Sequence, residues 1–192
     1  MSDAARVEEP PGRMTREEFY RWVEGRPGKY ERVDGKVFAM APERVRHSLI
    51  KAEAYSALRE AVQERGLPCT VFVDGPTIQV EQSDYEPDVI VRCGSVEIAV
   101  DGFAIPDPVI LVEILSPTTR RVDLSQKLAD YFRLPTVQHY LILFADRVQA
   151  IHHRRADAQI ETRIVTEGEI VLNPPGITVP LSKFYPGAAV SQ

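Results

Sequence analysis

The sequence predicts a mixed α/β (α+β) fold in which a central mixed β-sheet is flanked by helices. Six of the seven residues in Val109–Leu115 are aliphatic. Such a run is apolar on both alternating faces, which is typical of a strand in the middle of a covered sheet. Apolar residues recur at helical spacing within Val45–Arg65. Strand-like and helix-like segments mix without strict alternation, which favours this fold class over a doubly wound parallel sheet.

Local signals place the elements in order along the chain. A short helix begins at Thr15, because Thr15 and Glu18 have the spacing of a capping box. Asp34-Gly35 predicts the turn of a β-hairpin, and Val45–Arg65 is the long helix. Strands are expected at Tyr30–Val33, Lys36–Met40, Thr70–Val73, Thr77–Val80, Asp88–Arg92, Val109–Leu115, Gln138–Phe144, Val148–His153, Gln159–Val165 and Glu169–Leu172, and a third helix at about Leu124–Leu134.

Composition indicates an ordinary globular chain. Apolar residues make up 44% and charged residues 27% of 192 positions. Residues 1–14 are polar and are expected to form a disordered tail, and residues 15–187 a single domain. No apolar run is long enough for a membrane helix. The N-terminus also lacks the apolar core of a signal peptide, so a cytoplasmic location is expected.

The net charge of −5 argues against broad non-specific adhesion to nucleic acid. A local basic patch remains compatible with that charge. Two candidates are Arg120-Arg121 and the segment His152–Arg155. For each of them a solvated loop or edge strand is the alternative.

The chain has two cysteines, Cys69 and Cys93. Two are too few for a disulfide framework or a cysteine-based zinc site. We therefore expect them to be reduced and to behave as small buried hydrophobic residues.

Glu113 is the charged residue within the apolar run Val109–Leu115. An isolated buried carboxylate is costly unless it is paired, hydrogen-bonded or bound to a metal. Taken alone, Glu113 is equally compatible with a structural ion pair and with a functional site.

Asp88 supplies a second carboxylate. It follows Pro87 at the start of a predicted strand, where proline is tolerated. If this strand lies beside Val109–Leu115, Asp88 and Glu113 meet at the strand ends, and a divalent cation would offset their repulsion. Mg²⁺ suits a site of one or two carboxylates, waters and substrate phosphates. Alone, Asp88 would be assigned to a turn or cap.

Lys127 lies three residues after Leu124 and four before Tyr131, on the core-facing edge of the third predicted helix. A lysine there can extend along apolar surface to reach water. It can also reach Glu113 and Asp88, where it would orient an attacking water and stabilise developing phosphate charge.

Proline-aspartate at a strand start, followed by a glutamate on the next apolar strand, resembles the restriction-endonuclease-like superfamily with its PD…(D/E)xK motif. The segment Glu113–Lys127 resembles more specifically the bacterial Uma-type family of proposed endonucleases, formerly a domain of unknown function. Leu115 stands where the motif lysine is usual, and in this family the lysine lies on the following helix. The resemblance covers about residues 14–186 and implies a restriction-endonuclease-like core.

The resemblance also implies roles for individual residues. Asp88, Glu113 and the backbone carbonyl of Ile114 would bind Mg²⁺, for which Mn²⁺ can substitute, and Lys127 would be the catalytic lysine. Further candidates are Glu31, His47 and Gln126 for accessory roles, and Arg120 and Arg121 for phosphate contacts. The alternatives for these residues are an exposed hairpin glutamate, a packed or capping histidine, a helix-capping glutamine and, for Tyr131, a core residue.

The sequence thus predicts a Mg²⁺-dependent endonuclease that hydrolyses phosphodiester bonds in DNA as a homodimer. Two alternatives stay open. One is a catalytically inactive nuclease-fold protein that acts as a nucleic-acid-binding or assembly module, which the acidic net charge favours. The other is a hydrolase that uses Asp88 and Glu113 as a metal-free acid–base pair, as in glycosidases. The single tryptophan gives that alternative little support.

Overall fold

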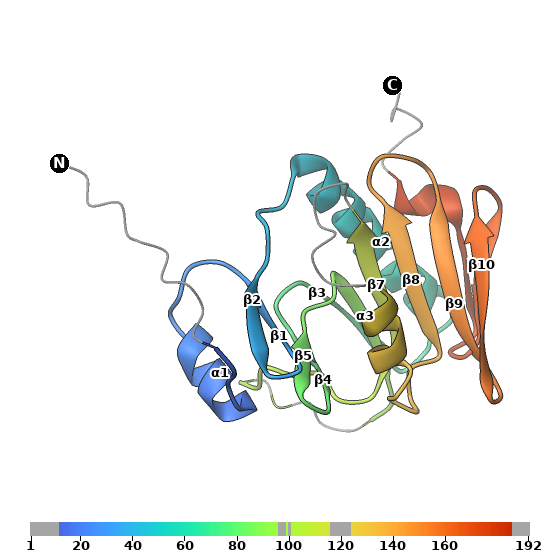
Figure 1. Ribbon diagram of the computed structural model, residues 1–192. Helices are drawn as coiled ribbons and strands as arrows, with labels where there is room; N and C mark the ends of the chain where they lie inside the picture. The colour runs from blue at the N-terminus through green and yellow to red at the C-terminus, as the bar shows by residue number, and fades with distance from the viewer. Residues whose placement is uncertain (1–11, 96–98, 100, 116–123, 186–192) are drawn as a thin grey trace.

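The centre of the molecule is a six-stranded mixed sheet with the strand order β10-β9-β8-β7-β6-β3 (Figure 1). The computed structural model describes residues 12–95, 99, 101–115 and 124–185. Strands β7 and β8 pair in parallel, and the other neighbours are antiparallel. The strands are β3 (Cys69–Val73), β6 (Val89–Cys93), β7 (Pro108–Leu115), β8 (His139–Phe144), β9 (Ala150–Ala156) and β10 (Gln159–Val165).

A smaller sheet and a separate hairpin accompany the large sheet. The smaller sheet has the order β2-β1-β5-β4, and β11 pairs with β12. These strands are β1 (Tyr30–Val33), β2 (Lys36–Ala39), β4 (Ile78–Val80), β5 (Ser83–Tyr85), β11 (Glu169–Leu172) and β12 (Ile177–Pro180). The helices are α1 (Arg16–Val23), α2 (Val45–Glu64), α3 (Leu124–Tyr131) and a 3-10 helix at Leu181–Phe184. Within the described ranges, no helix is long and apolar enough to span a membrane.

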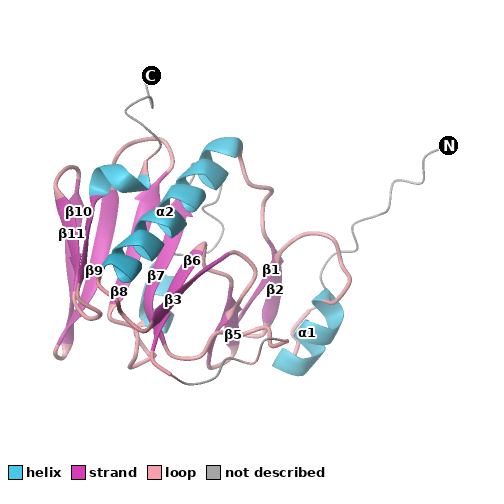
Figure 2. Cartoon of the chain, turned by 180° about the vertical axis from the view of Figure 1, so that it is seen from behind, coloured by secondary structure: helices cyan, strands magenta, loops and turns pink. Residues whose placement is uncertain are grey.

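Different elements cover the two faces of the large sheet. Helix α2 packs on one face, against Val89, Val91 and Val112 (Figure 2). Helix α3 and the smaller sheet pack on the other, against Ile90 and Leu111 (Figure 1). Because successive side chains of a strand point to opposite faces, β7 is buried on both sides. This is the environment that its apolar sequence predicts.

The N-terminal elements form where the local signals place them. The Thr15 hydroxyl accepts the backbone N–H of Glu18, and the Glu18 carboxylate accepts the backbone N–H of Thr15. Asp34 and Gly35 both have positive φ, 49° and 78°, which is the conformation that the hairpin turn between β1 and β2 requires. The capping box and the hairpin are therefore confirmed.

Two strands of the structure are not predicted by the sequence. β5 has three residues, and its central Asp84 is buried through ion pairs with Arg16 and Arg32. β12 ends at Pro180 and lies beyond Glu169–Leu172, the last strand that the sequence predicts. β5 is short and polar and carries no apolar alternation, so tertiary contacts decide its conformation. β12 does alternate, with Ile177 and Val179 buried, but only over four residues.

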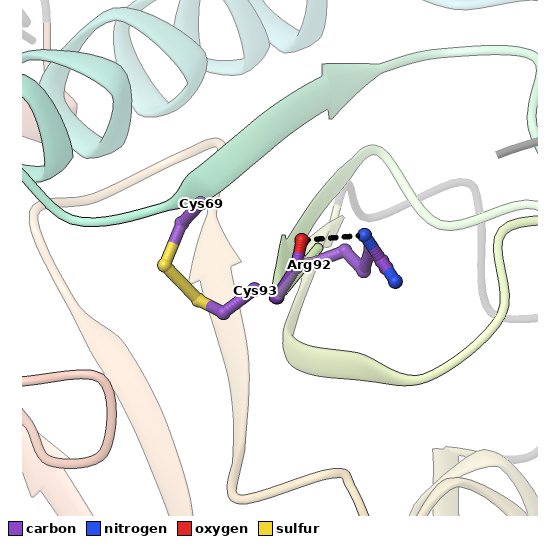
Figure 3. The surroundings of a disulfide bond; sticks show 4 residues. Cys69, Arg92 and Cys93 are labelled. Carbon is purple, nitrogen blue, oxygen red and sulfur yellow. Dashed lines mark hydrogen bonds between the residues drawn. A yellow bond between two sulfur atoms is a disulfide. The ribbon is translucent and has the colours of Figure 1, made fainter. Parts of the chain in front are cut away.

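The expectation of two free cysteines is wrong. Cys69 and Cys93 face each other in the β3–β6 register and form a disulfide (Figure 3). Their Cα atoms are 4.0 Å apart although 24 residues separate them in sequence, so only the strand pairing reveals their proximity. The adjacent Arg92 donates a hydrogen bond of 2.9 Å to the Gly94 carbonyl (Figure 3).

Candidate active site

The two carboxylates singled out in the sequence lie at the same end of neighbouring strands. Asp88 directly precedes β6, and Glu113 lies near the end of β7. In the antiparallel register Val89 is opposite Val112, which places Asp88 alongside Glu113. The Asp88 Oδ2 atom accepts a hydrogen bond of 2.7 Å from the backbone N–H of Ile114. The strand pairing that the site requires is therefore present.

On the α3 side, Lys127 joins two carboxylates. Its Nζ lies 2.8 Å from Oε1 of Glu113 and 2.8 Å from Oε1 of Glu31. Tyr131, one helical turn further along α3, donates its hydroxyl to the same Glu113 oxygen at 2.8 Å. Glu31 and Lys127 are buried. The backbone N–H of Glu86 also donates to Glu31, at 3.0 Å, and this fixes the β1 carboxylate in place.

The protonation of this group follows from burial and neighbouring charge. Burial raises the pKa of Glu113 to about 7; the ammonium of Lys127 opposes that rise, and the charges of Glu31 and Asp88 add to it. Burial alone would lower the pKa of Lys127, but Glu113 and Glu31 outweigh it and raise this pKa well above its usual value. Lys127 therefore stays an ammonium at neutral pH, while Glu113 titrates there.

On the α2 side, Asp88 has a different set of partners. His47 Nε2 lies 2.9 Å and Lys51 Nζ 3.0 Å from its Oδ1 atom. His47 and Lys51 are one turn apart on α2, so both reach the same oxygen. Burial would raise the pKa of Asp88, but the His47 hydrogen bond, the nearby positive charges and the Ile114 N–H together lower it. Asp88 is consequently ionised at neutral pH.

Acidic residues surround Lys51 at the rim of the site. Lys51 forms ion pairs with Glu43 and, at 3.2 Å, with Asp74. The ligand atoms of Glu43, His47 and Asp88 all lie within 4.8 Å of one another. Carboxylate oxygens suit Mg²⁺, and an imidazole suits transition metals. The donor set around Asp88 therefore fits a divalent cation.

The backbone of Ile114 completes this donor set. The N–H and C=O of one strand residue point to the same edge of the strand, as the paired bonds of antiparallel ladders require. Since the Ile114 N–H faces Asp88, its carbonyl lies on that edge too. Asp88, Glu113 and the Ile114 carbonyl would therefore present oxygen ligands where β6 begins and β7 ends.

The remaining predicted residues are Glu31, His47, Gln126, Arg120 and Arg121. Glu31 and His47 are buried and contact Lys127 and Asp88, so the exposed-glutamate alternative is excluded. Gln126 points elsewhere, because its amide donates to Asp34 Oδ2 in the hairpin turn at 2.9 Å. Arg120 and Arg121 lie outside the described residues.

Besides the rim acid Glu43, two buried contributors to the site were not identified from the sequence. Lys51 interrupts the apolar face of α2 one turn after His47, and this lysine among buried alanines and isoleucine is a signal that the sequence does contain. Tyr131 is expected to be a core residue; it is buried, but its hydroxyl also contacts Glu113. A buried tyrosine hydroxyl usually finds a polar partner, so its contact is physically reasonable.

Comparison with known proteins agrees with this fold. A chain from Anabaena variabilis, described as a putative nuclease belonging to DUF820, has a crystal structure that matches with a TM-score of 0.68 at 16% identity. The match covers 90% of this chain and 97% of that chain. The expected mixed α/β fold with a restriction-endonuclease-like core is confirmed. The uncharacterized protein slr1290 of Synechocystis is 29% identical over 151 residues, 77% of this chain and 78% of that protein.

The sequence also matches a protein family over most of its length. The family model is described as "Uma2: Putative restriction endonuclease", and the match covers residues 16–182. The matched range contains Asp88, Glu113 and Lys127, together with all the elements that position them. This chain therefore belongs to the Uma2 family.

Proposed function

We propose that this protein is a metal-dependent endonuclease that hydrolyses phosphodiester bonds in DNA. Membership of the family supports a nuclease. The observation that carries the proposal is the position of Lys127, whose Nζ lies 2.8 Å from Glu113 beside Asp88. Leu115 stands where the short motif has its lysine, and Lys127 takes the place of that lysine. The aspartate, the glutamate and the lysine that the chemistry needs are therefore all present.

Asp88, Glu113 and the Ile114 carbonyl would hold Mg²⁺ or Mn²⁺, with Glu43 and His47 near enough to add ligands. The bound ion would lower the pKa of a water and offset the charge on the phosphate. Hydrolysis adds one water molecule to phosphorus and breaks one P–O ester bond. The departing oxygen takes a proton, and the products are a phosphate monoester and a hydroxyl group.

The protein's own residues have separate tasks in this scheme. Lys127 orients the attacking water and stabilises the extra negative charge of the transition state. Glu31 and Tyr131 are positioning residues, because they hold Lys127 and Glu113 in place through hydrogen bonds. His47 and Lys51 keep Asp88 ionised, and Lys51 holds the oxygen for which a cation would compete.

The choice of DNA as substrate, phosphate contacts by Arg120 and Arg121, and assembly as a homodimer are further parts of this proposal. The acidic net charge favours the alternative of a nuclease-fold module that binds without cutting. The two differ in one respect: only the enzyme requires Lys127 and Glu113 for a chemical step.

Nicking of supercoiled plasmid with Mg²⁺ or Mn²⁺ tests the proposal, with a matched RNA as second substrate. We expect Lys127→Met and Glu113→Gln to lower the cleavage rate at least about 100-fold. Lys183→Met is the matched control, since Lys183 pairs with Glu60 on the exposed surface. Equal cleavage by wild type and Glu113→Gln would contradict the enzyme, and cleavage of RNA alone would contradict the substrate.

A further inference from the structure

The outermost strand of the large sheet, β10, has an open edge. Among the described strands it pairs only with β9, and it ends the sheet on the side opposite β3 (Figure 1). β10 is seven residues long and contains neither proline nor lysine, the residues that commonly protect edge strands. An unprotected edge presents a row of unpaired N–H and C=O groups to another strand.

Two isoleucines of β10 are exposed on one face. Ile160 has 40% and Ile164 has 68% of its surface accessible. Both lie on the same face as Thr162, because side chains two residues apart share a face. Glu161 and Arg163 lie on the opposite face. The strand thus combines an exposed apolar row with an exposed charged row.

The sequence of β10, Gln-Ile-Glu-Thr-Arg-Ile-Val, is complementary to itself about Thr162. In an antiparallel pair with a two-fold axis at Thr162, Glu161 lies opposite the partner subunit's Arg163, and Ile160 lies opposite the partner subunit's Ile164. Opposite charges and β-branched pairs in these positions are favourable. Each of these two pairs forms twice, as an isologous interface requires.

The neighbouring registers are unfavourable by the same rules. A two-fold axis at Glu161 would place that carboxylate opposite its own copy, and an axis at Arg163 would do the same with two guanidinium groups. Like charges directly opposite each other destabilise a strand pair. A slip by one residue would place side chains of opposite faces against each other. The axis at Thr162 is therefore preferred among these neighbouring registers.

The two charged residues are accessible for such pairing. Glu161 pairs with Arg154 at 2.6 Å within the subunit, and both side chains are about 40% exposed. Arg163 is exposed and makes no ion pair within the described part of the chain. One carboxylate can accept from two guanidinium groups, so Glu161 can keep Arg154 and add the partner subunit's Arg163.

We infer that β10 is a homodimer interface in which a second copy of the chain pairs edge to edge about Thr162. The large sheets of the two subunits then form one continuous sheet. The strand that pairs with β10 belongs to a second copy of the chain, because the order of charges and the positions of the isoleucines in β10 match its own reversed sequence. This inference does not depend on the nuclease activity, so either can fail without the other.

A cysteine at the axis tests the register directly. Thr162→Cys places two thiols opposite each other, with Cα atoms about 5 Å apart, within disulfide reach. Ile160→Cys is the matched control, because its two copies would lie roughly 14 Å apart along the strand direction. After mild oxidation we expect covalent dimers from Thr162→Cys and at least 10-fold fewer from Ile160→Cys. Equal yields, or no dimer from Thr162→Cys, would overturn the register.

Sedimentation equilibrium of the full chain tests the interface itself. We expect wild type to be dimeric and Ile164→Lys to dissociate at least 10-fold more readily, because the lysine would face the partner subunit's Ile160. Val148→Lys is the control, since Val148 is 45% exposed but lies outside β10. A monomeric wild type, or an Ile164→Lys variant that dimerises as tightly as wild type, would show that β10 is not the interface.

Discussion

Two buried lysines serve the candidate site from opposite faces of the large sheet. Lys127 comes from α3 and contacts Glu113, and Lys51 comes from α2 and contacts Asp88. Both are about 5% exposed. They differ in their remaining partners: Lys127 shares its charge with the buried Glu31, whereas Lys51 shares its charge with Glu43 and Asp74 at the rim.

Lys127 and its partners form a closed group that is shielded from water on the α3 side. Lys51 and its partners form an open group at the rim on the α2 side. The partners of Lys127 have 2% and 14% of their side-chain surface exposed, and those of Lys51 at the rim have 24% and 43%. Charges near water are screened and can be solvated when a partner is lost, whereas buried charges cannot. The α3 side is therefore built for rigid placement, and the α2 side can exchange one cation for another.

The largest effect is expected from Lys127→Met, which breaks the closed group. Removing the ammonium leaves Glu31 and Glu113 buried without compensation and should lower the free energy of unfolding by about 3 kcal/mol at pH 7. Urea denaturation measures this free energy of unfolding. In the double variant with Glu113→Gln the loss should be smaller, because one of the two acids is gone. Equal losses in the single and double variants would show that the two groups are not coupled.

The pH dependence of stability should differ in sign between the two sides. The pKa of Glu113 is raised by burial from 4.5 to about 7 in the folded protein, so the folded state holds its proton longer. Its contribution to stability is therefore complete below about pH 4.5 and is lost as the pH rises through 7. Asp88 has a lowered pKa, so its contribution is present above pH 3.8 and is lost as the pH falls.

Glu113→Gln isolates the first of these two slopes. Without added metal, we expect this variant to lose the decline in unfolding free energy between pH 4.5 and 7 that wild type shows, as measured by urea denaturation at several pH values. Gln126→Ala on the nearby helix should keep the wild-type slope. An unchanged slope in Glu113→Gln would mean that another group titrates in this range.

A smaller effect on stability, but a distinct effect on metal binding, is expected from Lys51→Met. His47 and the Ile114 N–H still bind Asp88, so the unfolding free energy should fall by only about 1–2 kcal/mol. The affinity for Mn²⁺, measured by electron paramagnetic resonance, should rise because the ammonium no longer competes for Asp88.

Lys29→Met is the matched control for this comparison. Lys29 pairs with the same rim acids, Glu43 and Asp74, but not with Asp88. If both variants bind Mn²⁺ equally tightly, general acidity at the rim rather than competition at Asp88 sets the affinity.

The sequence predicts the closed side of the site better than the open side. On the closed side, Glu113 and Lys127 carry local signals, namely an apolar strand and helical spacing after Leu124, and the structure brings them together. On the open side the sequence singles out Asp88, after Pro87, and His47, but not Lys51. The open side depends on long-range placement. Lys51 meets Asp74 and Asp88 only because α2 packs across the sheet, and no local pattern specifies that crossing.

The same distinction explains the errors in the fold. The disulfide and β5 depend on which strands become neighbours, not on local propensity. Cys69 and Cys93 are separated by 24 residues, and Asp84 in β5 is fixed by Arg16 from α1. Which strands become neighbours depends on the topology of the whole chain. Patterns in a single sequence predict the individual helices and strands but not how they pair.

The smallest effect is expected from Gln126→Ala, which lies next to Lys127 on α3. Its amide contacts Asp34 in the hairpin turn and no site carboxylate among the described residues. Alanine is also the better helix former. The unfolding free energy should therefore change by less than about 0.5 kcal/mol and the nicking rate by less than about 2-fold. Loss of nicking in this variant would mean that the hairpin turn holds α3, and with it Lys127, in register over Glu113.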